Sequence, residues 1–110
     1  MSRPLHILPA AHRDLARIRD WYEKEQAGFA AKFALEVDET MRRIADSPLA
    51  FPLFAKRTRR ARLRRFPYSL CFVTTSERLL VTGVIHNHRG PNTWQSRVRE
   101  KQPGAYEARP

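Results

Sequence analysis

The stretch PAAHRDLARIRDWYEKEQAGFAAKFALEVDETMRRIAD, residues 9–46, decides the fold. In its first half apolar residues recur at intervals of four, three and four, at Ala11, Leu15, Ile18 and Tyr22. This spacing is one face of a helix, which we expect over residues 10–25, with Asp14 and Asp20 on its other faces. Pro9 suits the first turn of that helix, because its missing N–H would have no intrahelical partner there.

The second half of the stretch has the same period. Its apolar residues are Phe29, Phe33, Val37, Met41 and Ile44. They predict a second helix over residues 28–46, which ends where Pro48 disfavours helical geometry in Ser47. The break at Ala27-Gly28 is short enough to fold the second helix back on the first. The stretch therefore predicts a long antiparallel helical hairpin.

Residues outside the hairpin change to the pattern of strands. Leu5–Leu8 is a short apolar run, and residues 49–56 suggest an irregular connection. The predicted strands after it cover about residues 60–65, Tyr68–Thr74 and Leu79–His86, and short turns between them indicate an antiparallel meander. We expect an α+β domain over residues 1–100, ordered β-αα-βββ, with the hairpin packed on a small, mostly antiparallel four-stranded sheet. After the last strand we expect a short helix at residues 91–99, and beyond the domain a flexible tail at 101–110.

The predicted core joins both helices to the sheet. Its helical members are Leu15, Ile18, Phe33, Val37, Met41 and Ile44, and Leu63 and one face of the last two strands complete it. In those two strands both alternating faces are apolar: Leu70 and Phe72 oppose Cys71 and Val73, while Val81 and Ile85 oppose Leu80 and Val84. Two helices cover only one face. The other face needs a partner chain, or else the tail or residues 48–56 fold over it.

Charge is distributed unevenly along the chain. Residues 1–46 carry eight acidic residues and eight Lys or Arg, so the net charge of +10 comes entirely from residues 47–110. The run KRTRRARLRRF at 56–66 has seven basic residues in eleven. Such asymmetry indicates an acidic partner, either nucleic acid or an acidic protein, unless the run is only a solvated face.

The basic run alternates as a strand does. We expect Ala61 and Leu63 to face the helices, and Arg60, Arg62 and Arg64 to form an outward row about 6–7 Å apart. A row with this spacing suits a phosphate chain or an acidic segment. The alternative is that these arginines only solvate an exposed edge strand.

Few residues suggest catalysis. No phosphate-binding glycine loop, HExxH or GxSxG motif occurs. His86 and His88 lie two apart without an acidic residue nearby, so we expect no metal site and no cofactor. With Arg89 they would suit phosphodiester cleavage, since histidine transfers protons near neutral pH and arginine stabilises a charged phosphorane. The alternative is that paired His and Arg residues at the end of a strand are structural or surface groups, which is the more frequent case.

Cellular location follows from what the sequence lacks. It has no apolar run of the roughly eighteen residues needed to span a membrane, and the N-terminus has no apolar signal-peptide core. Cys71 is the only cysteine, so an internal disulfide is excluded, and we expect it to be a small buried residue. We therefore expect a cytoplasmic protein.

Four segments, in order over about residues 5–99, resemble the RelE/ParE family of toxins from bacterial type II toxin–antitoxin systems. They are AAHRDLARIRDWYE, FAAKFALEVDETMRRIADSPLAFP, RRARLRRFPYSLCFV and VIHNHRGPNTWQSR. The resemblance implies the β-αα-βββ fold, a role in growth inhibition and plasmid stabilisation, and neutralisation by an acidic antitoxin whose C-terminal part wraps the toxin. The antitoxin would then cover the second apolar face of the sheet.

The family has two branches. One resembles RelE and cleaves mRNA in the ribosome; the other resembles ParE and poisons DNA gyrase. The ribonuclease branch commonly has an arginine after the first tyrosine of the third strand, where this chain has Ser69 after Tyr68. It also tends to have a basic end to the last strand and a late tyrosine, where this chain has histidines and then Trp94. The long hairpin favours the ParE branch.

We therefore expect a ParE-like toxin, with a RelE-like endoribonuclease as the alternative and a non-toxic basic nucleic-acid-binding module as a second alternative. In the ribonuclease reading, His86 and Arg89 are the candidate catalytic residues. The candidate residues for binding the target or antitoxin are Arg60, Arg62, Arg64, Arg65, Tyr68, His88 and Trp94. The partners implied are the antitoxin and either gyrase or the ribosome and its mRNA.

Overall fold

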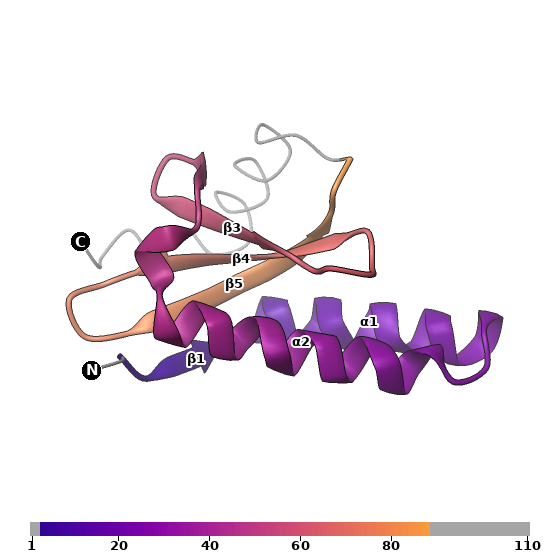
Figure 1. Cartoon of the computed structure of the whole chain (residues 1–110). Coiled ribbons are helices and arrows are strands. Elements are labelled where there is room, and N and C mark those ends of the chain that lie inside the picture. Colours follow the sequence, from indigo (N-terminus) through magenta and orange to yellow (C-terminus); the bar gives the residue numbers. More distant parts are fainter. Residues whose placement is uncertain (1–2, 89–110) are drawn as a thin grey trace.

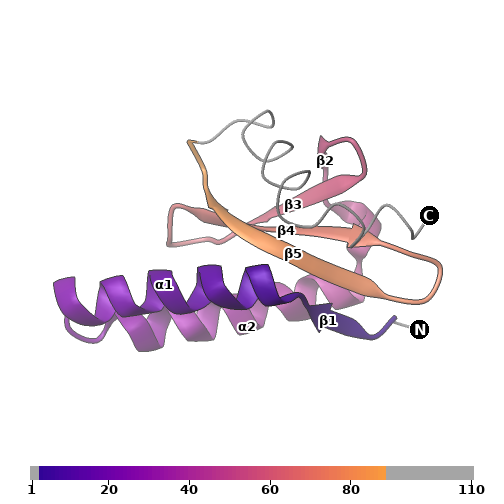
Figure 2. The same cartoon turned by 180° about the vertical axis from the view of Figure 1, so that it is seen from behind.

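The computed structural model describes residues 3–88. The elements are β1 (Leu5–Ile7), α1 (Pro9–Glu25), α2 (Phe29–Asp46), the 3-10 turn η1 (Pro48–Ala50), β2 (Leu53–Ala55), β3 (Thr58–Arg62), β4 (Tyr68–Thr74) and β5 (Leu79–His86). The two helices run side by side along the sheet (Figures 1 and 2). The helix expected at residues 91–99 and the tail expected at 101–110 lie outside the described residues.

The hairpin matches the prediction to within one residue at each end. The backbone N–H of Gln26 caps α1 by donating to the carbonyl of Tyr22. Gly28 then takes a left-handed conformation, with φ of 82°, which a side chain would strain. α2 ends where the Ser47 N–H donates to the Arg43 carbonyl, directly before Pro48. No helix among residues 3–88 is long and apolar enough to cross a membrane.

The sheet has five strands, in the order β1-β5-β4-β3-β2. β1 pairs parallel with β5, and the other neighbours are antiparallel. The predicted α+β class and element order are therefore confirmed, with one strand more than expected. The additional strand is β2, in the segment expected to be irregular: Leu53 pairs with Arg59, and the register shifts before Ala55 pairs with Thr58.

The core lies between the hairpin and the sheet, as predicted. Ile18, Phe33, Val37, Ile44 and Leu63 are buried in one cluster with the helix-facing residues of β4 and β5, and Leu15 and Met41 pack against it. Aromatic rings strengthen this cluster, since Phe66 meets the rings of both Tyr22 and Phe33 edge-on, at 5.2 and 5.4 Å between centroids.

A β-bulge changes the faces of β5. Cys71 pairs with Gly83 and Phe72 pairs with Val81, which leaves Thr82 as an additional residue. Consequently Val81 and Val84 both belong to the cluster under the helices, whereas strict alternation placed them on opposite faces. That part of the prediction was wrong.

The second face of the sheet is buried within this single chain. Cys71 and Ile85 form a small cluster with Ala55 and Phe54, and Val73 and Leu80 pack with Leu8. Each of the four strand residues is at most 5% exposed. Phe54 and Ala55 belong to β2, so the segment before β3 extends this apolar face as an edge strand of the sheet.

Candidate functional site

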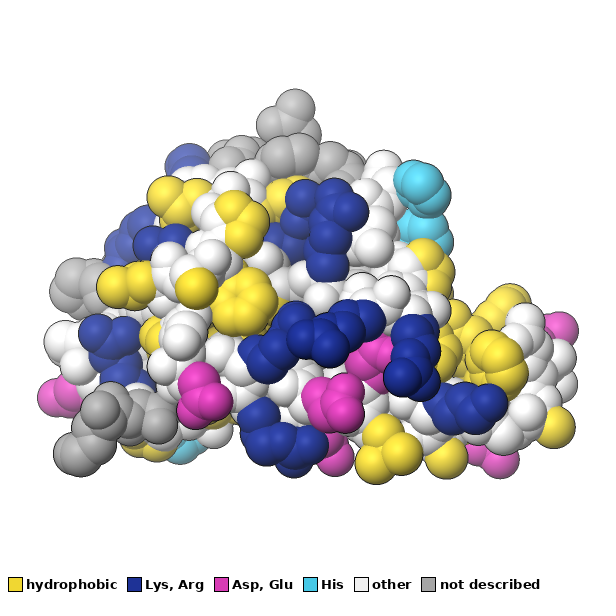
Figure 3. Space-filling model, viewed as in Figure 1, with side chains coloured by type: hydrophobic (Ala, Val, Ile, Leu, Met, Phe, Trp, Pro, Cys, Tyr) yellow, Lys and Arg dark blue, Asp and Glu magenta, His cyan; other side chains and the backbone are white. Residues whose placement is uncertain are grey.

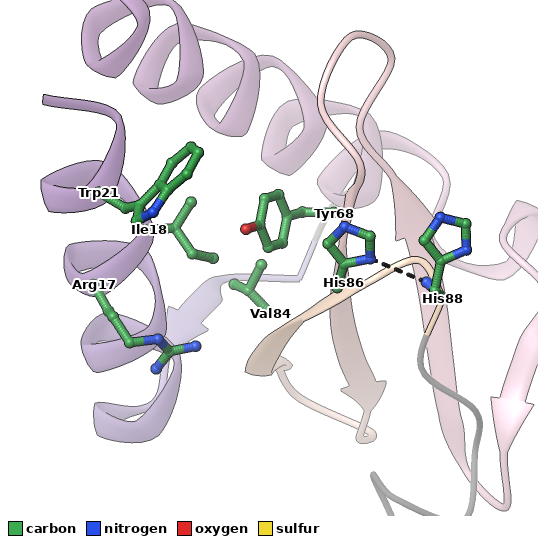
Figure 4. Close-up of a pocket in the computed structure, with 7 residues that line it drawn as sticks. All are labelled: Arg17, Ile18, Trp21, Tyr68, Val84, His86 and His88. Atoms are coloured by element: carbon green, nitrogen blue, oxygen red, sulfur yellow. Dashed lines mark hydrogen bonds between the residues drawn. The ribbon is translucent and has the colours of Figure 1, made fainter. Parts of the chain in front are cut away.

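A pocket of about 460 Å³ opens between α1 and the adjoining ends of β4 and β5. Figure 4 shows its walls: α1 supplies one side and the two strands supply the other. The lining residues are Arg17, Ile18, Trp21, Tyr68, Val84, His86 and His88. Three of these, Tyr68, His86 and His88, were predicted from the sequence as site residues.

The helical wall follows from the spacing of its residues on α1. Ile18 is only 4% exposed and belongs to the core, whereas Trp21, three residues on, is 52% exposed. The Trp21 indole meets the neighbouring Tyr22 ring edge-on, at 5.1 Å between centroids. α1 thus presents a large aromatic surface to solvent beside an apolar floor made by Ile18 and Val84.

The strand wall is built by a cross-strand pair. Tyr68 pairs with His86 in the β4–β5 ladder, and their rings meet edge-on at 5.3 Å between centroids. The His88 ring stacks on His86 at 4.9 Å, with 29° between the planes. The backbone N–H of His88 also donates to Nδ1 of His86 at 3.2 Å. In its neutral form His86 therefore carries its proton on Nε2 and is a hydrogen-bond donor there.

A buried carboxylate holds the two walls together. Asp14 is 1% exposed, and its Oδ2 accepts the backbone N–H of Val84 at 2.9 Å. Its Oδ1 accepts from Nη1 of Arg17 at 3.2 Å, and the Arg17 side chain is itself 65% exposed. Asp14 was expected on an outer face of the helix; instead it links α1 to β5 two residues before His86.

Tyr22, the residue that follows Trp21 on α1, belongs to the buried core. Burial, and to a lesser extent the neighbouring Tyr68, raises the pKa of the Tyr22 phenol above its ordinary value of 10.0. Tyr22 is 7% exposed and packs on Phe33 and Phe66. It therefore stays protonated under physiological conditions and supports the wall that carries Trp21.

The three arginines predicted to form a row do not form one. Arg60 and Arg62 pair with Cys71 and Ser69, which places both on the face of the sheet away from the helices. β3 ends at Arg62, and the chain bends because the carboxylate of Glu36, on α2, accepts the backbone N–H of Arg65 at 2.7 Å.

Arg64 consequently lies with α2. It lines a second cleft, of about 390 Å³, together with Glu36, Glu39, Thr40, Arg42, Arg43 and Asp46. The space-filling view shows Lys and Arg side chains gathered over this side of the molecule, with acidic side chains among them (Figure 3). The basic surface is therefore a band partly compensated by acidic groups of α2.

Arg59 and Arg60 also make local contacts. The Arg60 guanidinium lies over the Phe54 ring at 4.8 Å, and Arg59 donates to the Phe51 carbonyl at 2.7 Å. These contacts hold β2 and the preceding turn against β3. Part of the charge in this run thus stabilises the edge of the sheet.

Ser69 is the residue that the family resemblance matches to the arginine of the ribonuclease branch. Its side chain is fully buried, and its hydroxyl hydrogen-bonds to Oδ1 of Asn87. This pair lies on the face opposite the pocket, since Ser69 neighbours Tyr68 along β4. Ser69 therefore supplies no positive charge to a phosphate there.

The structure brings together part of the predicted site. Tyr68, His86 and His88 share the pocket, whereas Arg60, Arg62, Arg64 and Arg65 lie elsewhere; Arg89 and Trp94 are outside the described residues. Arg17 and Trp21 were missed, although a tryptophan beside the apolar stripe of α1 was a usable signal. Among residues 3–88, no three His, Cys, Asp or Glu side chains are grouped so that they could hold a metal ion.

Comparison with known proteins places this geometry in a family. No curated protein sequence matches the chain. Similar solved structures include the chromosomal ParDE system of Pseudomonas aeruginosa (19% identity, TM-score 0.68, covering 77% of this chain and 96% of that one). They also include the RelBE2 toxin–antitoxin complex of Mycobacterium tuberculosis (20% identity, TM-score 0.56, covering 78% of this chain and 99% of that one). At these identities they show the shared fold. A family model described as the ParE toxin of the type II toxin–antitoxin system parDE matches residues 5–91. The chain therefore belongs to the ParE toxin family.

Proposed function

We propose that this protein inhibits growth by acting on DNA gyrase in the cytoplasm. The observation that carries the proposal is the match to the ParE family over residues 5–91, which spans both helices and the whole sheet. In this reading the protein is a poison of an enzyme, and its surface has to bind a target; it needs no bond-breaking residues of its own.

The buried Ser69 supports this reading over ribonuclease action. Cleavage of RNA needs a positive charge near the phosphorane that forms in the transition state. Ser69 is neutral, buried and hydrogen-bonded to Asn87. The position that carries arginine in the ribonuclease branch therefore has a structural role in this chain.

A cognate antitoxin is the second part of the proposal. Two of the similar structures are a ParDE system and a RelBE2 toxin–antitoxin complex. Residues 47–110 of this chain carry the entire net charge of +10, which favours an acidic partner. Maintenance of a plasmid that encodes both proteins is the role we propose, because cells that lose the plasmid lose the antitoxin that neutralises the toxin.

Controlled expression tests the proposal. The full chain is induced in bacteria alone or with the neighbouring reading frame, while growth, plasmid supercoiling, DNA-damage signalling and mRNA integrity are followed. We expect growth arrest that the neighbour relieves, with raised damage signalling and altered supercoiling. Unchanged supercoiling and damage signalling during arrest would contradict action on gyrase.

A second candidate function, cleavage of mRNA in the ribosome, rests on the chemistry of the pocket. Tyr68, His86 and His88 lie opposite Arg17, so proton-transfer groups and a guanidinium line one pocket. Here rapid cutting of translated mRNA, with supercoiling intact, is the expected result. His86→Ala would abolish cutting, whereas His12→Ala, at an exposed position of α1 outside the pocket, is the matched control. Expression without any growth arrest would favour the non-toxic binding module.

A further inference from the structure

We propose that the pocket between α1 and the ends of β4 and β5 binds one unpaired nucleotide, with its base against Trp21 and its phosphate at Arg17. This goes beyond the proposed action on gyrase and does not depend on it, because a toxin directed at gyrase requires no nucleotide site; the pocket is the one that the second candidate function uses. The proposal rests on the shape of the pocket, the chemistry of its walls and the charge of the chain.

The aromatic wall provides the first reason. Trp21 is 52% exposed, although its neighbours on α1, Ile18 and Tyr22, are 4% and 7% exposed. Leaving an indole in water forgoes the free energy of its burial. The same exposed ring is a platform on which a base can stack, and the buried Ile18 and Val84 make the floor beside it apolar (Figure 4).

The polar rim provides the second reason. Figure 4 shows the Tyr68 hydroxyl directed from the sheet toward α1 and the Arg17 guanidinium at the other end of the pocket. Because Nδ1 of His86 accepts the His88 N–H, Nε2 of His86 is a donor in the neutral ring. The pocket thus offers donors for the edge of a base and a guanidinium for a phosphate. Arg17 contacts Asp14, but its 65% exposure leaves donors facing solvent.

The size of the pocket and the charge of the chain limit the classes of ligand that could bind. The pocket volume of about 460 Å³ falls within the range of roughly 300–1,000 Å³ common for small-molecule sites. A base inside a duplex hides its faces in the stack, so only an unpaired base can lie on the indole. The chain has a net charge of +10, which favours the approach of a polyanion to the protein over that of a neutral peptide.

Binding to oligonucleotides tests the proposal. The purified full chain is titrated into fluorescently labelled ten-nucleotide single strands of uridine or deoxythymidine, a duplex of ten base pairs, and inorganic polyphosphate, which has charge but no bases. We expect the single strands to bind more tightly than polyphosphate of equal charge. Comparing the two sugars shows whether the natural source is RNA or DNA, since RNA is distinguished by its 2′-hydroxyl.

Variants separate stacking from charge. Trp21→Ala leaves the net charge unchanged and should weaken single-strand binding roughly ten-fold, whereas Trp21→Phe should retain most of it. Leu35→Ala, at an apolar position of α2 that is 66% exposed, is the matched control. Arg17→Gln should weaken the single strands and reduce the salt dependence of their binding.

Three results would overturn the proposal. The first is single-strand affinity unchanged in a folded Trp21→Ala protein. The second is an equal loss of polyphosphate binding in that variant. The third is displacement of the bound strand by an acidic peptide that contains an aromatic residue, at concentrations where mononucleotides have no effect, provided that the displacement requires Trp21. The pocket would then be a peptide site. Circular dichroism on each variant establishes that folding is intact.

Discussion

Removing the carboxylate of Asp14 tests how the pocket walls are held together. Asp14→Ala deletes the acceptor for the buried Val84 N–H, a contact between residues 70 positions apart in the chain. An unsatisfied buried N–H costs about 1–3 kcal/mol, and hydrogen bonds to charged groups are at the upper end of such values. The ion pair with Arg17 adds little, because that side chain is 65% exposed.

We therefore expect Asp14→Ala to lower the free energy of unfolding by roughly 2–3 kcal/mol. In a domain of this size that corresponds to a fall in Tm of roughly 10–20 °C. Asp14→Asn keeps one oxygen acceptor, so it should cost about 1 kcal/mol. Arg17→Ala should cost less than 1 kcal/mol, roughly the value of an exposed ion pair.

Chemical denaturation followed by circular dichroism measures these differences. Asp20→Ala is the matched control, since Asp20 is an exposed acidic residue on the same helix. The reasoning fails if Asp14→Ala unfolds at the same denaturant concentration as Asp20→Ala. It also fails if Arg17→Ala is as damaging as Asp14→Ala, because the ion pair would then account for the loss.

Three further predictions concern the core, the bend and alkaline pH. Val37→Asp should lower the free energy of unfolding by several kcal/mol in a denaturant titration, because it buries an unpaired charge at a 6% exposed position; melting like the parent would refute the helix register. Glu36→Ala should cost about 1–3 kcal/mol by orphaning the Arg65 N–H, and Glu36→Gln, which keeps an acceptor, should cost less; equal midpoints would contradict this role. The pKa of Tyr22 is raised by folding, so its contribution to stability is present below pH 10.0 and is lost as pH rises through the folded pKa. Denaturation midpoints measured across that range should therefore decline less in Tyr22→Phe, and an identical decline would count against it.

Sequence patterns predicted the parts of the fold that local interactions determine. The helices carry a strong 3.6-residue period, Gly28 separates them and Pro48 follows the second, so their bounds were correct to within one residue. The missed features depend on contacts distant in sequence. β2 has only three residues and forms through pairing with β3, and β3 stops because Glu36 binds the bend that follows it.

The bulge in β5 and the pocket likewise depend on contacts that sequence patterns do not predict. Both faces of β5 are apolar, so its composition gives no sign of the additional residue at Thr82. Asp14 has the pattern of a surface residue on α1, and its partner is a backbone N–H, which no sequence pattern marks. The strand side of the pocket was predictable because Tyr68 and His86 lie at the ends of well-formed strands, whereas Arg17 and Trp21 meet them only through the packing of α1.

The position of β5 in the sheet governs when the protein becomes a folded molecule. β5 is the last described strand along the chain, yet it lies between β1 and β4, and Leu5 pairs with Leu79. Pairings so distant in sequence form late, because the loop between them must close first. During synthesis β1 lacks its pairing partner among the described strands, and the Asp14 carboxylate lacks the Val84 N–H that donates to it, until β5 has left the ribosome. A nascent chain without β5 therefore lacks the β1–β5 and β4–β5 pairings and the His86 side of the pocket, so neither the complete sheet nor the pocket exists before β5 is made.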